Sequence, residues 1–270
     1  MTPHKHAAKH PEIWRRFSPR QTLLRFAWYL GIVAVAVWSI SAMDITWFFL
    51  LDAHVQALDM ATRMWPPDVG YFRKLATPLI ETIHIATLGT VATVLVAFPV
   101  AFLSARNTTF NSLTWFIGRF ILVASRSVNT VVWALLFVAV FGPGPLAGIW
   151  AITFRSVGFL GKLVAEAIEE IDTGVVEAIE STGASRLQVL WIGILPQVLP
   201  VIYGTTVYRW DINIRESSVL GFVGAGGIGI LLYSAINQFI WQEVSVILIA
   251  IFGVVMLSEF VSAAVRRRIT

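Results

Sequence analysis

The chain of 270 residues is 57% hydrophobic and only 13% charged, and its formal net charge is +4. Soluble domains carry about 25% charged residues, so this composition excludes an ordinary soluble protein and predicts an integral membrane protein. The sequence has no cysteine, which excludes a disulfide framework and a thiolate metal site. The net positive charge comes mostly from the two ends of the chain. The charge therefore does not indicate nucleic-acid binding, and no nucleic-acid partner is expected.

Apolar runs of about 20 residues, the length of a bilayer-spanning helix, recur along the chain. Five are clear and one is irregular, so the sequence predicts an all-α protein with six transmembrane helices. In chain order these are residues 24–43, 79–105, 120–141, 146–163, 191–209 and 244–265. A further apolar stretch, residues 219–236, is too rich in glycine to be counted as a span.

Lysine and arginine residues set the predicted orientation, because they favour the cytoplasmic side. They gather in the tail 1–23, after the second and fourth spans, and in residues 266–270. Both termini are therefore expected in the cytoplasm, with residues 44–78 outside or at the interface. The span 24–43 is interpreted as an uncleaved anchor, because its basic region is too long for a signal peptide. The histidines His4, His6 and His10 are interpreted as part of a solvated tail, so no metal site is expected.

A polar, amphipathic stretch, EAIESTGASRLQVLWIGILP (177–196), follows the fourth span. The pattern predicts a short acidic helix, a turn at Gly183 and a second helix from Ser185, which together form a cytoplasmic elbow over residues 173–190. The stretch resembles the EAA loop of type I ABC importer permeases, although Ile179 and Gly193 depart from the pattern. The resemblance implies coupling to an ATPase through a set of six residues: Glu177, Ala178, Gly183, Ala184, Leu195 and Pro196. Pro196 and Pro200 also predict a kink just beyond the elbow.

The segment YRWDINIRESSVLGFVGAGGIG (208–229) carries charges next to an apolar span. Such charges should face the interior of the bundle, water or one another. Arg209 and Asn213 are four residues apart, as are Asp211 and Arg215, so each pair should share a helical face near the outer mouth. The second pair is either a local ion pair or functional. The glycines of residues 221–229 are expected to pack across a symmetry axis.

Two further arginines lie within predicted spans. Arg126 and Asn129 are three residues apart in the span 120–141 and should share a face. An arginine within the membrane is a functional candidate by default, and we favour that interpretation for Arg126. For Arg155, a functional and a structural role are equally open. The structural alternative is that each arginine pairs with Glu81 or Glu259.

The motifs SRSVN (125–129), FGPGPLAG (141–148) and LPQVLP (195–200), with the segment 208–229, resemble the permease of a phosphonate- or phosphite-type ABC importer. The resemblance implies a homodimer in the bacterial inner membrane that moves the oxyanion by alternating access. Two cytoplasmic ATPase subunits would hold ATP and Mg, and a periplasmic binding protein would deliver the anion. This chain has no Walker A motif, so no catalysis and no cofactor of its own are expected. The predicted pathway residues are Arg126, Asn129, Arg155, Arg209, Asn213 and Arg215.

Other functions stay open at this point. The chain could be an ABC permease for another small solute such as methionine. An ion-coupled secondary transporter would need carboxylates that lie more centrally than Glu81 and Glu259, and it would leave the elbow unexplained. A membrane-embedded enzyme is the weakest alternative, because the sequence shows no metal-ligand cluster and no nucleophile paired with a base.

Overall fold

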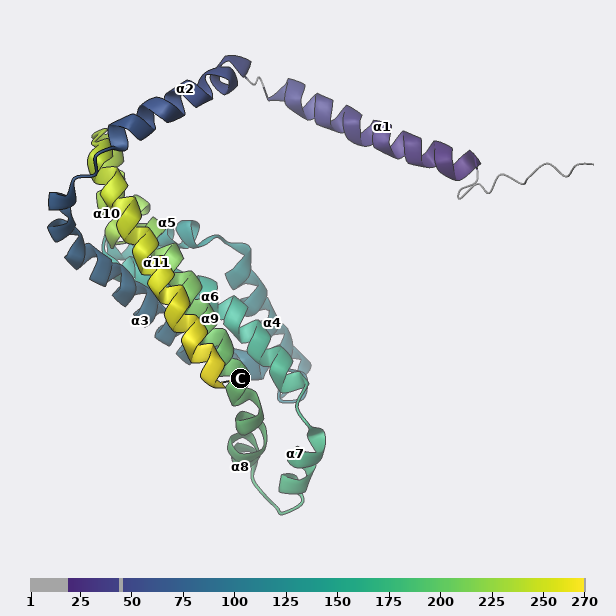
Figure 1. Ribbon diagram of the computed structural model, residues 1–270. Helices are drawn as coiled ribbons and strands as arrows, with labels where there is room; N and C mark the ends of the chain where they lie inside the picture. Colours follow the sequence, from purple (N-terminus) through teal and green to yellow (C-terminus); the bar gives the residue numbers. More distant parts are fainter. Residues whose placement is uncertain (1–18, 44–45, 270) are drawn as a thin grey trace, which may run out of the picture. The chain divides into compact units, whose positions relative to one another are not determined.

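The computed structural model describes residues 19–43 and 46–269, and helices are the regular secondary structure over these residues (Figure 1). The chain forms two units, residues 1–59 and residues 60–270. In the first unit, α1 (Pro19–Ala42) is a long apolar helix that buries none of its side chains within the chain. Helix α2 (Trp47–Met64) begins in the first unit and ends in the second. It occupies the segment that the sequence predicted to be external or interfacial.

The second unit is a bundle of helices that ends in a protruding hairpin (Figure 1). Its elements are η1 (Val69–Tyr71), α3 (Phe72–Ser104), α4 (Ser112–Ser127), α5 (Thr130–Phe141), α6 (Pro145–Glu169), α7 (Thr173–Glu180), α8 (Arg186–Gln188), η2 (Val189–Ile194), α9 (Leu195–Leu220), η3 (Gly221–Val223), α10 (Ile228–Asn237) and α11 (Trp241–Ile269). Five helical segments of the described chain are long and apolar enough to cross a membrane, and the bent pair α4–α5 makes six. This agrees with the predicted number of spans.

Helices α3 and α6 form the centre of the bundle, and α4, α5 and α9 pack against them. The largest buried cluster joins α3, α4, α6 and α9 and includes Ala97, Ala101, Leu160, Val164 and Val198. Small side chains on α3 let the helix axes approach closely, which is how helices associate in a membrane without a hydrophobic driving force between them. The central pair therefore provides a rigid frame on which the polar residues of α9 are held.

The predicted span at residues 120–141 is not one continuous helix, because α4 and α5 meet at an angle of 96°. Asn129 begins a new helix there: its side-chain oxygen accepts a hydrogen bond from the backbone N–H of Val131 at 3.0 Å. An asparagine at this position satisfies a backbone donor that the first turn leaves free. Helix α5 then packs on α6 through the rings of Phe137 and Phe154, whose centroids lie 5.1 Å apart.

A π-helical turn, η2, lies between the elbow and α9 and ends before the first proline, whereas the predicted kink at Pro196 and Pro200 stays a prediction. Pro196 lies in the first turn of α9, where its missing N–H removes no helical hydrogen bond. Helix α9 continues through Pro200 to Leu220. The irregular hydrogen bonding therefore lies between the elbow and the long helix.

Part of the glycine-rich stretch after α9 packs within the chain, and its expected packing across a symmetry axis stays a prediction. Gly226 and Gly227 have φ values of +88° and +76°, in the left-handed region that favours glycine. A side chain at either position would approach Glu81 or Thr82 of α3 to 2.8 and 2.7 Å. The backbone N–H of Gly227 donates to Oε1 of Glu81 at 3.1 Å. These glycines therefore serve contacts with α3.

Candidate functional site

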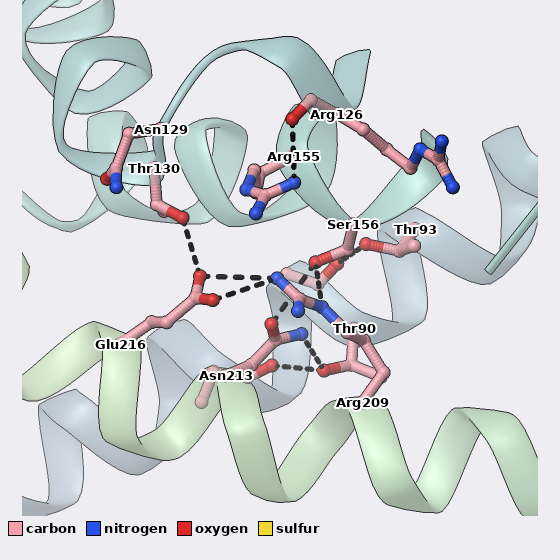
Figure 2. Close-up of polar contacts among 12 residues, drawn as sticks. Thr90, Thr93, Arg126, Asn129, Thr130, Arg155, Ser156, Arg209, Asn213 and Glu216 are labelled. Atoms are coloured by element: carbon pink, nitrogen blue, oxygen red, sulfur yellow. Dashed lines mark hydrogen bonds and ion pairs between the residues drawn. The ribbon is translucent and has the colours of Figure 1, made fainter. Parts of the chain in front are cut away.

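A buried polar network connects four helices in the middle of the second unit (Figure 2). Nη2 of Arg209 lies 3.1 Å from Oε1 of Glu216, and the Nε of Arg209 donates to the hydroxyl of Ser156 at 2.8 Å. The Ser156 hydroxyl donates in turn to Oδ1 of Asn213 at 3.1 Å, and Asn213 Nδ2 donates to the hydroxyl of Thr90 at 2.8 Å. The network therefore joins α9 to α6 and α3.

Helix α5 is tied to the same network at its first residue. The hydroxyl of Thr130 donates to Oε2 of Glu216 at 2.6 Å. Arg209 and Asn213 are 4% and 0% exposed, and their predicted place near the outer mouth stays a prediction. Because α9 continues to Leu220, these side chains lie inside the bundle, where they satisfy one another. A buried charge is tolerated when it is paired and hydrogen-bonded in this way.

A second cation, Arg155, lies beside the break between α4 and α5 (Figure 2). Its Nη1 donates to the backbone carbonyl of Arg126 at 3.1 Å. Neither Arg155 nor Arg126 forms an ion pair with Glu81, Glu259 or another acidic residue of the described chain, so the structural alternative considered from the sequence does not apply. Arg155 is half-buried, and most of the N–H groups of its guanidinium therefore stay free to bind another group.

Arg126 and Asn129 do not share a helical face, contrary to the sequence prediction. Arg126 ends α4, whereas Asn129 caps α5 beyond the 96° bend. Figure 2 shows the Arg126 side chain extending away from Arg155 and from the buried network. Both residues are exposed in the single chain. The bend has thus separated two residues that a continuous helix would have placed together.

Asp211 and Arg215 form the expected ion pair on α9. Asp211 is buried and accepts a further hydrogen bond from the hydroxyl of Ser258 at 2.7 Å, which links α9 to α11. The Arg215 side chain is 44% exposed. The pair therefore anchors α11 on one side and presents a guanidinium at the surface on the other.

The elbow predicted at residues 173–190 is a helical hairpin that projects beyond the end of the bundle (Figure 1). Asp172 caps α7 by accepting from the Gly174 N–H at 2.8 Å, and its own N–H donates to Oε1 of Gln197 at 3.0 Å. Gly183 makes the turn with φ of +81°, and its N–H donates to the carbonyl of Glu180 at 2.9 Å. These contacts fix the hairpin relative to α9.

The outer surface of the hairpin mixes charged and apolar side chains. Glu177, Ala178 and Gly183 are exposed, and Ala184 is half-buried. The apolar residues Val175 and Leu187 are 42% and 66% exposed. Leu195 and Pro196 lie instead at the start of α9, where Leu195 packs against the core.

Sequence reasoning missed the partners that complete the buried network: Thr90, Thr130 and Glu216. Glu216 follows Arg209 by seven residues, or two helical turns, so this spacing could have indicated the ion pair. Thr90 and Thr130 gave no such signal, because they reach the network from α3 and α5. The three histidines of the N-terminal tail lie outside the described residues, and no cluster of potential metal ligands occurs among residues 19–43 and 46–269.

The fold and these features define a polytopic membrane transport protein, and comparison with known sequences gives its family. Residues 97–270 match the family described as "Binding-protein-dependent transport system inner membrane component". The chain belongs to this family of ABC importer permeases, and it is a multi-pass protein of the inner membrane. The family predicted from the sequence motifs is thereby confirmed.

Two relatives illustrate the similarity. The chain is 39% identical to the phosphite transport system permease protein PtxC of Stutzerimonas stutzeri, over 88% of this chain and 86% of that protein. It is 36% identical to the phosphate-import permease protein PhnE of Mycolicibacterium smegmatis, over 83% of this chain and 41% of that protein. The similarity to PtxC extends over nearly the whole of both chains.

A solved structure confirms the predicted fold class. The chain resembles a protein in inward-facing structures of the MetNI methionine ABC transporter, with a TM-score of 0.64 and 22% identity. The match covers 75% of this chain and 99% of that chain. At this identity the likeness concerns the fold alone, which is the helical fold of a type I importer permease.

Proposed function

We propose that the chain is the membrane-spanning subunit of an ATP-driven importer that moves phosphite or phosphonate-like oxyanions into the cytoplasm by alternating access. The observation that carries the substrate class is the 39% identity with a phosphite permease over 88% of the chain. The chain itself binds no nucleotide in this proposal. ATP and Mg are held by separate ATPase subunits, and a periplasmic solute-binding protein delivers the anion.

The α7–α8 hairpin is the coupling element in this proposal. Its exposed residues Glu177 and Ala178, together with Val175 and Leu187, offer a mixed polar and apolar surface to an ATPase subunit. The tie between Asp172 and Gln197 supports transmission of the docking movement into α9. The C-terminal end of α11 is proposed to lie on the cytoplasmic side with the elbow, which is supported by its place on the hairpin side of the bundle in Figure 1. The N-terminus is proposed to lie on the same side, from the distribution of basic residues.

Arg155 is the leading residue for contact with the passing anion. It is half-buried and has no acidic partner among the residues that the structure describes, whereas the charge of Arg209 is balanced by Glu216. Guanidinium groups fit the geometry of phosphoryl oxygens. Asn129 and exposed Arg215 are secondary candidates. Arg209 and Asn213 are proposed to hold the helices together rather than to touch the solute.

Two copies of the chain are proposed to enclose the passage, with one ATPase subunit on each elbow. Half-buried Arg155 and exposed Asn129 support this arrangement, because a single chain leaves their polar groups without an enclosing wall. Cyclic twofold assembly is the commonest symmetry of homo-oligomers.

The proposed function is tested by uptake into proteoliposomes that contain the permease, its ATPase and its binding protein. Phosphite and a simple alkylphosphonate should be accumulated in an ATP-dependent manner, and each should compete with the other. Accumulation of methionine without competition by phosphite would support the alternative of a permease for another small solute. Uptake driven by a proton or sodium gradient without ATP would overturn the proposal.

A further inference from the structure

Gln197, the third residue of α9, lies where the elbow meets the bundle. Its Oε1 accepts a hydrogen bond from the backbone N–H of Asp172 at 3.0 Å, and its Nε2 donates to the backbone carbonyl of Gly193 at 2.7 Å. Only one orientation of the amide satisfies both bonds, because one contact needs an acceptor and the other needs a donor. A single side chain therefore connects the N-cap of α7, the turn η2 and the start of α9.

The turn η2 has irregular backbone hydrogen bonding, and Gln197 supports it. The N–H of Leu195 donates to the carbonyl of Leu190, five residues back, as in a π-helix. The next residue, Pro196, has no N–H to donate. The Nε2 group of Gln197 supplies a donor at this point, and the carbonyl of Gly193 accepts it. The geometry of the turn is therefore fixed in part by a side chain of α9.

The elbow packs on η2 through a second contact, between Ile179 of α7 and Gly193. Gly193 is buried, and a Cβ atom there would lie 3.1 Å from Cδ1 of Ile179 and 3.9 Å from Cα of Val176. Val176 and Ile179 are three residues apart, so they share the inner face of α7. Ile179 and Gly193 are also the two positions at which the elbow departs from the EAA-loop pattern. The structure places these two departures against each other, so that a large side chain on α7 fills the space that the glycine leaves.

These contacts lie between the elbow and the buried network. Helix α7 packs on η2, and η2 packs on α9. Glu177 and Ala178, which lie between the two inner positions of α7, are exposed. Helix α9 carries Arg209 and Asn213, whose hydrogen bonds reach α6 and α3. A displacement of α7 therefore reaches the buried network through η2 and the start of α9.

We infer that Gln197 is a positioning residue that makes the elbow and α9 move as one rigid lever, with Ile179 against Gly193 as the second point of attachment. The inference rests on the proposed function, because the lever acts when an ATPase subunit moves the elbow. Gly193 is buried and Gln197 is half-buried behind the exposed surface of the elbow, so both transmit the movement without contact with the ATPase.

The first test measures solute uptake per ATP hydrolysed in proteoliposomes that contain the permease, its ATPase and its binding protein. Gln197→Met keeps the length of the side chain and removes both hydrogen bonds. ATPase association and basal ATP hydrolysis should persist, whereas the uptake per ATP should fall roughly tenfold, because two hydrogen bonds are lost. The matched control is Gln238→Met, which removes an exposed amide bonded to Ser234 at the end of α10 and should change nothing. An equal ratio in the wild type and Gln197→Met would overturn the inference.

Exchanging the sizes of the two packed residues tests the second contact. Gly193→Leu should lower the uptake per ATP because the new side chain meets Ile179, and Ile179→Ala should lower it because the space at Gly193 is left unfilled. The φ of Gly193 lies outside the left-handed region, so leucine meets no backbone strain there. The double variant restores one large and one small residue, and it should transport better than either single variant. Additive losses would overturn the inference, and this cycle decides it even if Gln197→Met does not fold.

Hydrogen exchange of the full-length chain in nanodiscs tests the Gln197 contact without transport. The N–H of Asp172 should exchange roughly tenfold faster in Gln197→Met than in the wild type, and Gln238→Met should leave it unchanged. Unchanged exchange would refute the contact, whatever the uptake. Faster exchange with a normal uptake per ATP would make the contact structural only and would overturn the lever. Faster exchange in a protein whose wild type shows no ATP-dependent uptake would refute the proposed function, and with it the lever, while the contact itself stands.

Discussion

Replacing Glu216 by leucine tests whether the buried network holds the bundle together. The change leaves the Arg209 guanidinium, whose side chain is 5% exposed, without its counter-charge. Removing one partner of a buried ion pair costs about 3–5 kcal/mol. The Glu216 side chain is 25% exposed, so water reaches one side of the pair and the lower value applies. For a helical unit of this size, a loss of about 3 kcal/mol corresponds to a fall in melting temperature of roughly 6–12 °C.

The double variant Arg209→Met with Glu216→Leu separates the charge from the packing. It removes both charged groups and leaves a methionine and a leucine, which fill part of the same space. Thr130 loses its acceptor, which costs about 1 kcal/mol, whereas Ser156 still donates to Asn213. The double variant should therefore melt above the single variant, even though it carries one more substitution.

The assay is thermal unfolding of the purified protein in nanodiscs, followed by tryptophan fluorescence. Lys162→Gln is the matched control, because it breaks an ion pair whose partners are 47% and 44% exposed and should cost less than about 1 kcal/mol. The reasoning is refuted if Glu216→Leu is no more destabilising than this control. It is also refuted if the double variant is as unstable as Glu216→Leu, since the loss would then come from packing alone.

Three further predictions concern the proposed function. Gly183→Val should insert into the membrane but lose ATPase association, because a β-branched residue is strained at φ of +81°. The control is Gly204→Val, where the space around the glycine is equally open, and this variant should still associate with the ATPase. Equal ATPase co-purification with both variants would count against the elbow. Arg155→Ala should lower phosphite uptake at least tenfold while ATP hydrolysis persists, with partial recovery in Arg155→Lys; normal uptake in Arg155→Ala would remove this residue from the passage. Native mass measurement of the intact complex should give two permease copies, and a single copy would contradict the dimer.

Much of the architecture was determined by local features of the sequence. Apolar runs of bilayer length predicted the number of spans, because a backbone in lipid must satisfy its hydrogen bonds within a helix. The elbow was also predictable. Gly183 permits the left-handed turn, and Ser185 begins the second helix through contacts that reach only to Gln188. Each of these signals acts within a few residues of the chain.

Only the tertiary structure decided the roles of the polar residues. The spacing of Arg126 and Asn129 indicated one helical face, but Asn129 instead caps a new helix that α6 holds at 96° to the old one. Arg209 was expected to face the passage, whereas Glu216 of its own helix and Ser156 of α6 make its burial favourable. Glu216 lies on the same helix as Arg209, but the hydroxyl groups that complete the network come from far along the chain: Ser156 is 53 residues from Arg209, and Thr130 is 86 residues from Glu216. Periodicity within one helix cannot identify such partners, because they become neighbours only when the helices pack.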